Sequence, residues 1–365
     1  MRVLVTGHHG YIGSVMVNIL RGAGHHVTGW DTDYYADCTF GQPDAHIEGL
    51  RKDIRDVHRD DLQGIDAVIH LAALSNDPVG NLKPEWTDEI NYRASVSLAQ
   101  AAKEAGVQCF VFSSSCSIYG AGGQSAQTED APLDPLTPYA VSKVRAEEAI
   151  ARLADQHFSP VFLRNATVYG VSPRLRVDLV LNNLVGWAYL TGKVRIMSDG
   201  TPWRPLVHVE DLCRVFAAML AAPRPRIHNQ AFNVGVNGEN YQVRDLASIV
   251  QRTVPRCVIE YTEEASADPR NYRVDFSKLA CLIPAGTFRW NASRGAQELY
   301  AAFQGVGLTL QDFQGYPYTR LKQLQRLIST NRLDETLRWV GTRPDGKDPA
   351  RLFTTAESRA TLKSG

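Results

Sequence analysis

The stretch VTGHHGYIGS, residues 5–14, carries three glycines at intervals of three and two adjacent histidines. It follows the β-branched run RVLVT (residues 2–6), and apolar residues then recur at helical spacing over residues 15–20. A second strand-like run, HVTGWD, ends at Asp31. The sequence therefore predicts a strand, a tight glycine turn, a helix and a second strand.

This unit is the fingerprint of a dinucleotide-binding fold, here written G-x-x-G-x-x-G at Gly7, Gly10 and Gly13. One glycine turns the chain, one lets backbone N–H groups approach a pyrophosphate, and one lets helix and strand pack closely. The helix N-terminus adds partial positive charge. His8 and His9 stand between the glycines, where the backbone matters more than the side chain. We interpret them as bystanders, with a hydrogen bond to phosphate as the alternative.

Asp31 indicates which dinucleotide the fold prefers. A carboxylate at the end of the second strand accepts hydrogen bonds from both ribose hydroxyls and repels a 2′-phosphate. The next residues, Thr32 and Asp33, bring no arginine. The sequence therefore favours NAD over NADP, the alternative being an ordinary turn aspartate.

Composition excludes several classes of protein. The 365 residues, 44% hydrophobic, are enough for two lobes, and 39 basic side chains balance 39 acidic ones. This balance argues against nucleic acid and acidic membranes as partners. No apolar run approaches the length of a membrane span, so we expect a cytoplasmic protein. Six scattered cysteines without metal-type spacing predict reduced core thiols, no disulfides and no metal.

The alternation of strands and helices continues through the first half of the chain. AVIHLAA (residues 67–73) and QCFVFSS (residues 108–114) are compact apolar runs typical of buried parallel strands. Between them, residues 84–105 have helical composition, with Asn91 near the middle. The pattern predicts a doubly wound parallel α/β sheet of Rossmann type.

Candidate catalytic residues follow the last of these strands. SSSCSIYG begins at Ser113, so its hydroxyls lie at the carboxyl edge of the sheet, where such folds bind ligands. In TPYAVSK, Tyr139 and Lys143 share one helix face. A phenol with a pKa of about 10 needs roughly 4 kcal/mol of preferential anion stabilisation to act as a base at pH 7. The lysine ammonium and a positive nicotinamide ring are the expected sources, with Ser115 holding the substrate hydroxyl.

From residue 1 to about residue 278 the chain resembles the extended short-chain dehydrogenase/reductases, specifically the NAD-dependent nucleotide-sugar epimerases and dehydratases. The resemblance rests on TGHHGYIG, KDIRD, HLAA, SSSCSIYG, PYAVSK, LRNATVYG, RPLVHVEDL and VDFSK. It implies Ser115, Tyr139 and Lys143 as the catalytic set. For NAD it implies Gly7, Gly10, Tyr11, Ile12, Gly13, Asp31, Asp53, Ile54, Leu71, Ala72, Ala73, Asn91, Ser113, Tyr139, Lys143 and Ala166. For the substrate we expect Thr167, Asn182, Arg204 and Arg270, with Asn165, Asn183 and Arg273 as alternatives.

The chain departs from the family pattern directly after Ser115. Sugar 4,6-dehydratases carry aspartate and glutamate there for the elimination of water, whereas this chain has Cys116 and Ser117. Dehydration is therefore disfavoured, and we interpret Cys116 as a small packed residue. Thr167 replaces an asparagine that touches the diphosphate in many of these epimerases.

We expect a NAD-binding Rossmann domain over residues 1–170, to which later segments return, and a smaller α/β substrate-binding lobe over residues 171–330. A C-terminal helical extension and tail would fill residues 331–365. The run YTRLKQLQRLISTNRLDETLRWV predicts one or two packed helices, and the stretch after Val340 predicts a loose tail. The resemblance implies a homodimer built on the helices around Asn91 and Tyr139.

The hypothesis from these motifs is an epimerase of a nucleotide-activated sugar that works through a transient 4-keto sugar and returns the hydride to the opposite face. The alternatives are an NAD(H)-dependent keto-sugar nucleotide oxidoreductase, a dehydratase, or a non-catalytic dinucleotide sensor.

Overall fold

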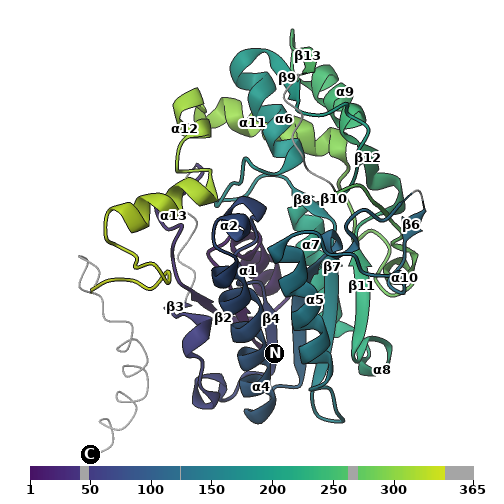
Figure 1. Cartoon of the computed structure of the whole chain (residues 1–365). Helices are drawn as coiled ribbons and strands as arrows, with labels where there is room; N and C mark the ends of the chain where they lie inside the picture. Colours follow the sequence, from purple (N-terminus) through teal and green to yellow (C-terminus); the bar gives the residue numbers. More distant parts are fainter. Residues whose placement is uncertain (42–48, 124, 262–269, 342–365) are drawn as a thin grey trace, which may run out of the picture.

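A computed structural model describes residues 1–41, 49–123, 125–261 and 270–341 and shows a larger and a smaller lobe (Figure 1). The larger lobe is built on a seven-stranded parallel sheet with the order β11-β7-β5-β4-β1-β2-β3. Its strands are β1 (Arg2–Thr6), β2 (His26–Asp31), β3 (Gly49–Arg51), β4 (Ala67–His70), β5 (Cys109–Ser115), β7 (Ser159–Asn165) and β11 (Gln230–Val234). The order reverses between β1 and β4, so the expected doubly wound sheet is confirmed.

Helices cover both faces of this sheet because successive side chains of a strand point to opposite sides. Val3 and Val5 of β1 pack into the core beneath one pair of helices, whereas Leu4 packs beneath the other pair. The first pair is α1 (Gly13–Gly22) and α7 (Val209–Ala221), and the second is α4 (Ala94–Glu104) and α5 (Pro138–Ala151).

The stretch expected to be helical around Asn91 contains three short elements before α4. They are α2 (Asp77–Leu82), α3 (Pro84–Thr87) and a π-helical turn, Asp88–Arg93. Such turns are often found at functional sites, and Asn91 lies inside this one.

The smaller lobe has its own apolar core. Its strands are β8 (Thr167–Tyr169), β10 (Trp203–His208) and β12 (Asn240–Gln242) in one sheet, with β9 (Lys193–Ile196) and β13 (Val258–Tyr261) in another. Its main helices are α6 (Val180–Thr191), α9 (Val243–Thr253) and α11 (Ala292–Val306). The short strands β6 (Ala126–Gln127) and β14 (Arg273–Val274) pair with each other, whereas α8 (Arg224–Ile227) and α10 (Ser277–Ala280) pack against β11 of the larger lobe. The chain passes between the lobes more than once, because β11 joins the large sheet beside β7.

The last described segment leaves the smaller lobe and returns to the larger one (Figure 1, yellow-green). It contains α12 (Leu310–Gln314), α13 (Arg320–Ser329) and a turn closed by a bridge between Leu333 and Trp339. The run from Tyr318 to Val340 thus forms one helix and a bridged turn, and the expected tail lies outside the described residues from 342 onward.

No helix in the described ranges has both the length and the apolar character to cross a membrane. The expected homodimer would use α5, whose apolar residues differ in exposure. Ala140 is 1% exposed and packs inside the lobe, while Val141 is 39% exposed. The homodimer remains a prediction.

Candidate active site

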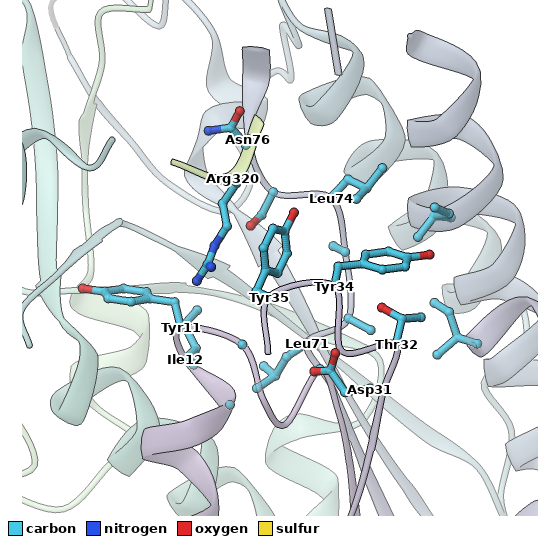
Figure 2. A pocket seen from close by; sticks show the side chains of 18 of the residues that line it. Tyr11, Ile12, Asp31, Thr32, Tyr34, Tyr35, Leu71, Leu74, Asn76 and Arg320 are labelled. Carbon is cyan, nitrogen blue, oxygen red and sulfur yellow. The ribbon is translucent and has the colours of Figure 1, made fainter. Parts of the chain in front are cut away.

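A pocket lies at the carboxyl edge of the large sheet, where β1, β2 and β4 end next to one another (Figure 2). The glycine loop after β1, the end of β2 and the loop after β4 form its walls. Of the expected cofactor residues, it is lined by Gly7, Gly10, Tyr11, Ile12, Gly13, Asp31, Asp53, Ile54, Leu71, Ala72 and Ala73. Segments far apart in the sequence therefore converge as expected for a dinucleotide site.

The glycine loop has the shape that a pyrophosphate needs. Gly7 has φ +74°, and a Cβ there would lie 2.9 Å from the backbone nitrogen of Ala72. A Cβ on Gly13 would lie 2.1 Å from the carbonyl oxygen of Gly7, so only glycine lets α1 start this close to the loop. No side chain caps the N-terminus of α1 and no acidic residue stands in its first turn. Its partial positive charge is thus available to a phosphate.

The two histidines of the loop face away from this position. His8 is 1% exposed, and its ring fills the space above Gly29 and Gly49, where a Cβ would collide with it. Burial, together with neighbouring His9, lowers the pKa of His8 to about 4. The His9 ring lies 2.7 Å from the carboxylate of Asp33. Both side chains serve the packing and anchoring of the loop.

Asp31 is fixed at the pocket wall by the backbone. Its carboxylate accepts hydrogen bonds from the N–H groups of His9 (3.0 Å) and Asp33 (2.9 Å). Burial and the charge of Asp33 raise the pKa of Asp31. Asp53 accepts a hydrogen bond from the backbone N–H of Arg55 at the start of a short 3₁₀ turn. Asp31 is thus preorganised to accept hydrogen bonds from a ribose.

Three further expected cofactor residues do not line the pocket, and they are hydrogen-bonded within the protein. Asn91 accepts a hydrogen bond from the Leu74 N–H (2.7 Å) and donates one to the Leu74 carbonyl (3.0 Å). Because Leu74 lines the pocket, Asn91 positions that wall. Ser113 accepts a hydrogen bond from Asn165, and Ala166 donates its N–H to a carbonyl of β11.

Ser115, Tyr139 and Lys143 come together beside this pocket. Ser115 is the last residue of β5, and Tyr139 stands in the first turn of α5, which Thr137 caps. The Ser115 hydroxyl is close enough to the Tyr139 phenol to lower its pKa. Lys143, one turn further, donates a 2.7 Å hydrogen bond to the Ser113 carbonyl, and its Nζ is 5.7 Å from the centre of the Tyr139 ring. The three expected catalytic side chains therefore lie close together.

Burial makes the neutral forms of both groups more stable. It raises the pKa of Tyr139 to about 12, with a further rise from the charge of Asp77. It lowers the pKa of Lys143 to about 7. The sequence suggested that the lysine would lower the pKa of the tyrosine, but in the protein without cofactor the pKa of Tyr139 is raised. The oxidised nicotinamide ring, the second source of positive charge that the sequence suggested, would act on the same phenol when bound.

The two arginines expected at the substrate contact each other, and Arg270 lies close enough to Tyr139 to affect its pKa. Arg204 donates to the Arg270 carbonyl (2.5 Å), and the Arg270 guanidinium is 2.8 Å from the Asp77 carboxylate. Arg176 and Arg270 lower the pKa of Tyr139 through their charge. Thr167 is half-buried in β8, next to β10, which carries Arg204.

A model of the NAD dependent epimerase/dehydratase family matches residues 3–235. The chain belongs to this family. It is 31% identical over 276 residues to a UDP-glucose 4-epimerase of Mycolicibacterium smegmatis, covering 70% of this chain and 83% of that one. It is 27% identical over 328 residues to the uncharacterized UDP-glucose epimerase YtcB of Bacillus subtilis, covering 84% and 100%.

Among solved structures, the chain resembles MoeE5 in complex with UDP-glucose and NAD, with a TM-score of 0.72 and 28% identity. The match covers 84% of this chain and 100% of MoeE5. The protein is thus an NAD-dependent enzyme of the nucleotide-sugar epimerase/dehydratase class, as its motifs predicted, and its glycine loop and Asp31 fit that cofactor.

In this epimerase/dehydratase, Asn182 has a different role from the expected contact with substrate. It is fully buried, its oxygen accepts from the Gly170 N–H (3.1 Å), and its nitrogen donates to the Arg176 carbonyl (2.9 Å). Tyr11 donates its hydroxyl proton to the Gly170 carbonyl (2.7 Å) beside it. Asn182 therefore holds the strand-to-helix connection in place, because both halves of its amide are already bonded within the protein.

The sequence reasoning missed several residues of the pocket wall. Tyr34 and Tyr35 follow Asp31, and Figure 2 shows Tyr35 lying between Tyr34 and Arg320. Arg176 arrives from the smaller lobe and Arg320 from α13. Of these residues, only the two tyrosines could have been predicted from the sequence, because they follow closely after the strand that ends at Asp31.

Proposed function

We propose that the protein is a 4-epimerase of a nucleoside-diphosphate sugar. The observation that carries the proposal is the environment directly after Ser115. Cys116 is fully buried, and its thiol donates to the Arg164 carbonyl (3.1 Å). Burial raises the pKa of this thiol well above its usual value. Ser117 is buried as well, so neither position offers the acid–base pair that elimination of water requires.

In the proposed reaction, Tyr139 takes the proton from the sugar O4 while Ser115 positions that hydroxyl. The Ser115 hydroxyl already lies close enough to the phenol to lower its pKa, so a substrate hydroxyl could contact both groups. Lys143 would stabilise the phenolate, and its hydrogen bond to the Ser113 carbonyl holds the ammonium in place. Bound NAD supplies the site that takes up and returns the hydride. Return to the opposite face of a turned 4-keto sugar gives the epimer without net reduction.

Support for the substrate class comes from the arginines and the relatives. Arg270 places positive charge near Tyr139, Arg204 donates to the Arg270 carbonyl, and a guanidinium binds a diphosphate well. The relatives named above are UDP-glucose epimerases, so UDP-hexoses are the first substrates to try.

The test incubates the purified protein with UDP-, dTDP-, GDP- and CDP-hexoses and follows both the sugar product and the NADH absorbance. An epimeric sugar without net NADH supports the proposal. Stoichiometric NADH would instead make the protein an oxidoreductase, a deoxy keto sugar would make it a dehydratase, and no reaction with any sugar would favour a sensor. Tyr139→Phe should lower kcat by about 10²- to 10⁴-fold while NAD stays bound.

A further inference from the structure

The segment after α11 packs against residues that line the cofactor pocket. Leu324 and Leu327 of α13 are 1% exposed, and Leu333 and Leu337 of the bridged turn are equally buried. They pack in one apolar cluster with Tyr34, Ile54, Leu74 and Ile90, four residues of the pocket wall. Tyr34 also donates its hydroxyl proton to the Leu337 carbonyl (2.5 Å). The C-terminal segment is thus part of the structure that shapes the pocket.

Arg320, the first residue of α13, reaches from this segment into the pocket. Its side chain is buried, and the guanidinium lies 4.1 Å above the ring of Tyr35. One nitrogen, Nη2, donates to the Arg174 carbonyl (2.8 Å). The other, Nη1, is buried and has no hydrogen-bond partner among the described residues. Figure 2 shows the guanidinium directed toward Tyr11 and Ile12 of the glycine loop.

The charge on Arg320 lacks the carboxylate partner that its neighbour has. Arg176, in the same pocket, forms a bidentate pair with Asp178 (2.6 and 3.0 Å). No carboxylate in the described ranges lies within ion-pair distance of Arg320. Burial and the charge of Arg176 accordingly lower the pKa of Arg320. A buried arginine with an unused donor is costly unless an anion joins it.

We propose that Arg320 binds the pyrophosphate of NAD, so that the C-terminal segment supplies a cation to the cofactor site. The pocket that Arg320 enters is the one lined by the glycine loop and Asp31. A diphosphate there accepts two hydrogen bonds from one guanidinium, whose Nη1 is already free to donate. The proposal concerns cofactor binding only and holds whichever sugar is turned over.

The experiment compares Arg320→Met with Arg326→Met in the full chain. Arg326 is on the same helix, is partly exposed and lies 3.4 Å from Asp37, so its replacement controls for the loss of a positive charge from α13. NAD and UDP are titrated separately by calorimetry into cofactor-depleted protein, and NAD retained through purification is measured after denaturation. Unfolding temperatures are recorded with and without NAD.

We expect Arg320→Met to bind NAD about 10- to 100-fold more weakly than Arg326→Met, to retain less NAD and to bind UDP unchanged. Without NAD it should unfold no lower than the control, because an uncompensated charge has been removed from the interior. Equal NAD affinity in the two variants would overturn the proposal. So would a loss confined to UDP, which would place the substrate diphosphate at Arg320. If Arg320→Met does not fold, Arg320→Gln is tested against Arg326→Gln with the same expectations.

Discussion

Lys143 offers a quantitative test of the electrostatics in the catalytic cluster. Its pKa is about 7 in the folded protein because the ammonium is buried, against about 10.5 for an ordinary lysine in the unfolded chain. Between these values the unfolded state binds more protons than the folded state. The contribution of Lys143 to the free energy of unfolding therefore rises with pH, at up to about 1.4 kcal/mol per pH unit.

The perturbation is Lys143→Met, which fills the same space without a titratable group. Replacement also leaves the Ser113 carbonyl without its donor, a cost that does not depend on pH. The stability of the wild type relative to the variant should then rise by about 2 kcal/mol between pH 7 and pH 9. With 365 residues and about 2.1 cal/mol/K of unfolding entropy per residue, that is a change of about 3 °C in the Tm difference.

The assay is thermal unfolding of cofactor-depleted protein at several pH values and fixed ionic strength. Taking the difference between wild type and variant cancels the titration of the other tyrosines and cysteines. Lys322→Met, at an exposed position of α13, controls for the loss of a lysine charge and should give a constant difference. A wild-type minus Lys143→Met difference that stays constant from pH 7 to pH 9, or falls, would refute the proposed cost of burying the ammonium.

Two further substitutions test the framework of the site. Gly13→Ala places a Cβ 2.1 Å from a backbone oxygen, so this variant should lose its bound NAD during purification. The control is Gly22→Ala in the same helix, whose Cβ meets nothing within 4 Å and which should retain NAD. A normal NAD content in Gly13→Ala would contradict the close approach of helix and loop. Glu147→Gln removes the buried partner of Arg164 (2.9 Å) and should lower stability by about 3 to 5 kcal/mol, or the Tm by about 4 to 6 °C. The control is Glu148→Gln, on the exposed side of α5, and equal Tm values for the two variants would count against a buried ion pair.

The parts of the site predictable from sequence are those whose signal is local. A glycine at a positive φ, a carboxylate at a strand end and a Tyr-x-x-x-Lys helix turn each carry their geometry within a few residues. Arg320 carries no such signal, since an arginine at the start of an amphipathic helix normally faces water. Its burial depends on the packing of Leu324 and Leu327 against residues more than 200 positions away.

Asn182 failed as a prediction for a related reason. Its position in the smaller lobe fitted a substrate contact, yet the buried backbone groups of Gly170 and Arg176 needed hydrogen-bond partners. Sequence alone does not reveal which polar groups a fold buries. Asn91 is likewise bonded to buried backbone groups: its amide holds Leu74, and Leu74 in turn lines the cofactor pocket.

The pKa values of Tyr139 and Lys143 connect the fold to the order of events in the reaction. At neutral pH a phenol with a pKa of about 12 keeps its proton, and the nearby Asp77 carboxylate helps to hold it there. Arg176 and Arg270 act in the opposite direction through their charge. Because Arg270 is paired with Asp77, an anionic substrate that draws Arg270 away would change both influences on the same phenol. Loss of the Arg270 charge and exposure of the Asp77 charge would each raise the pKa of Tyr139, so Tyr139 loses its proton most readily in a complex that keeps Arg270 beside it.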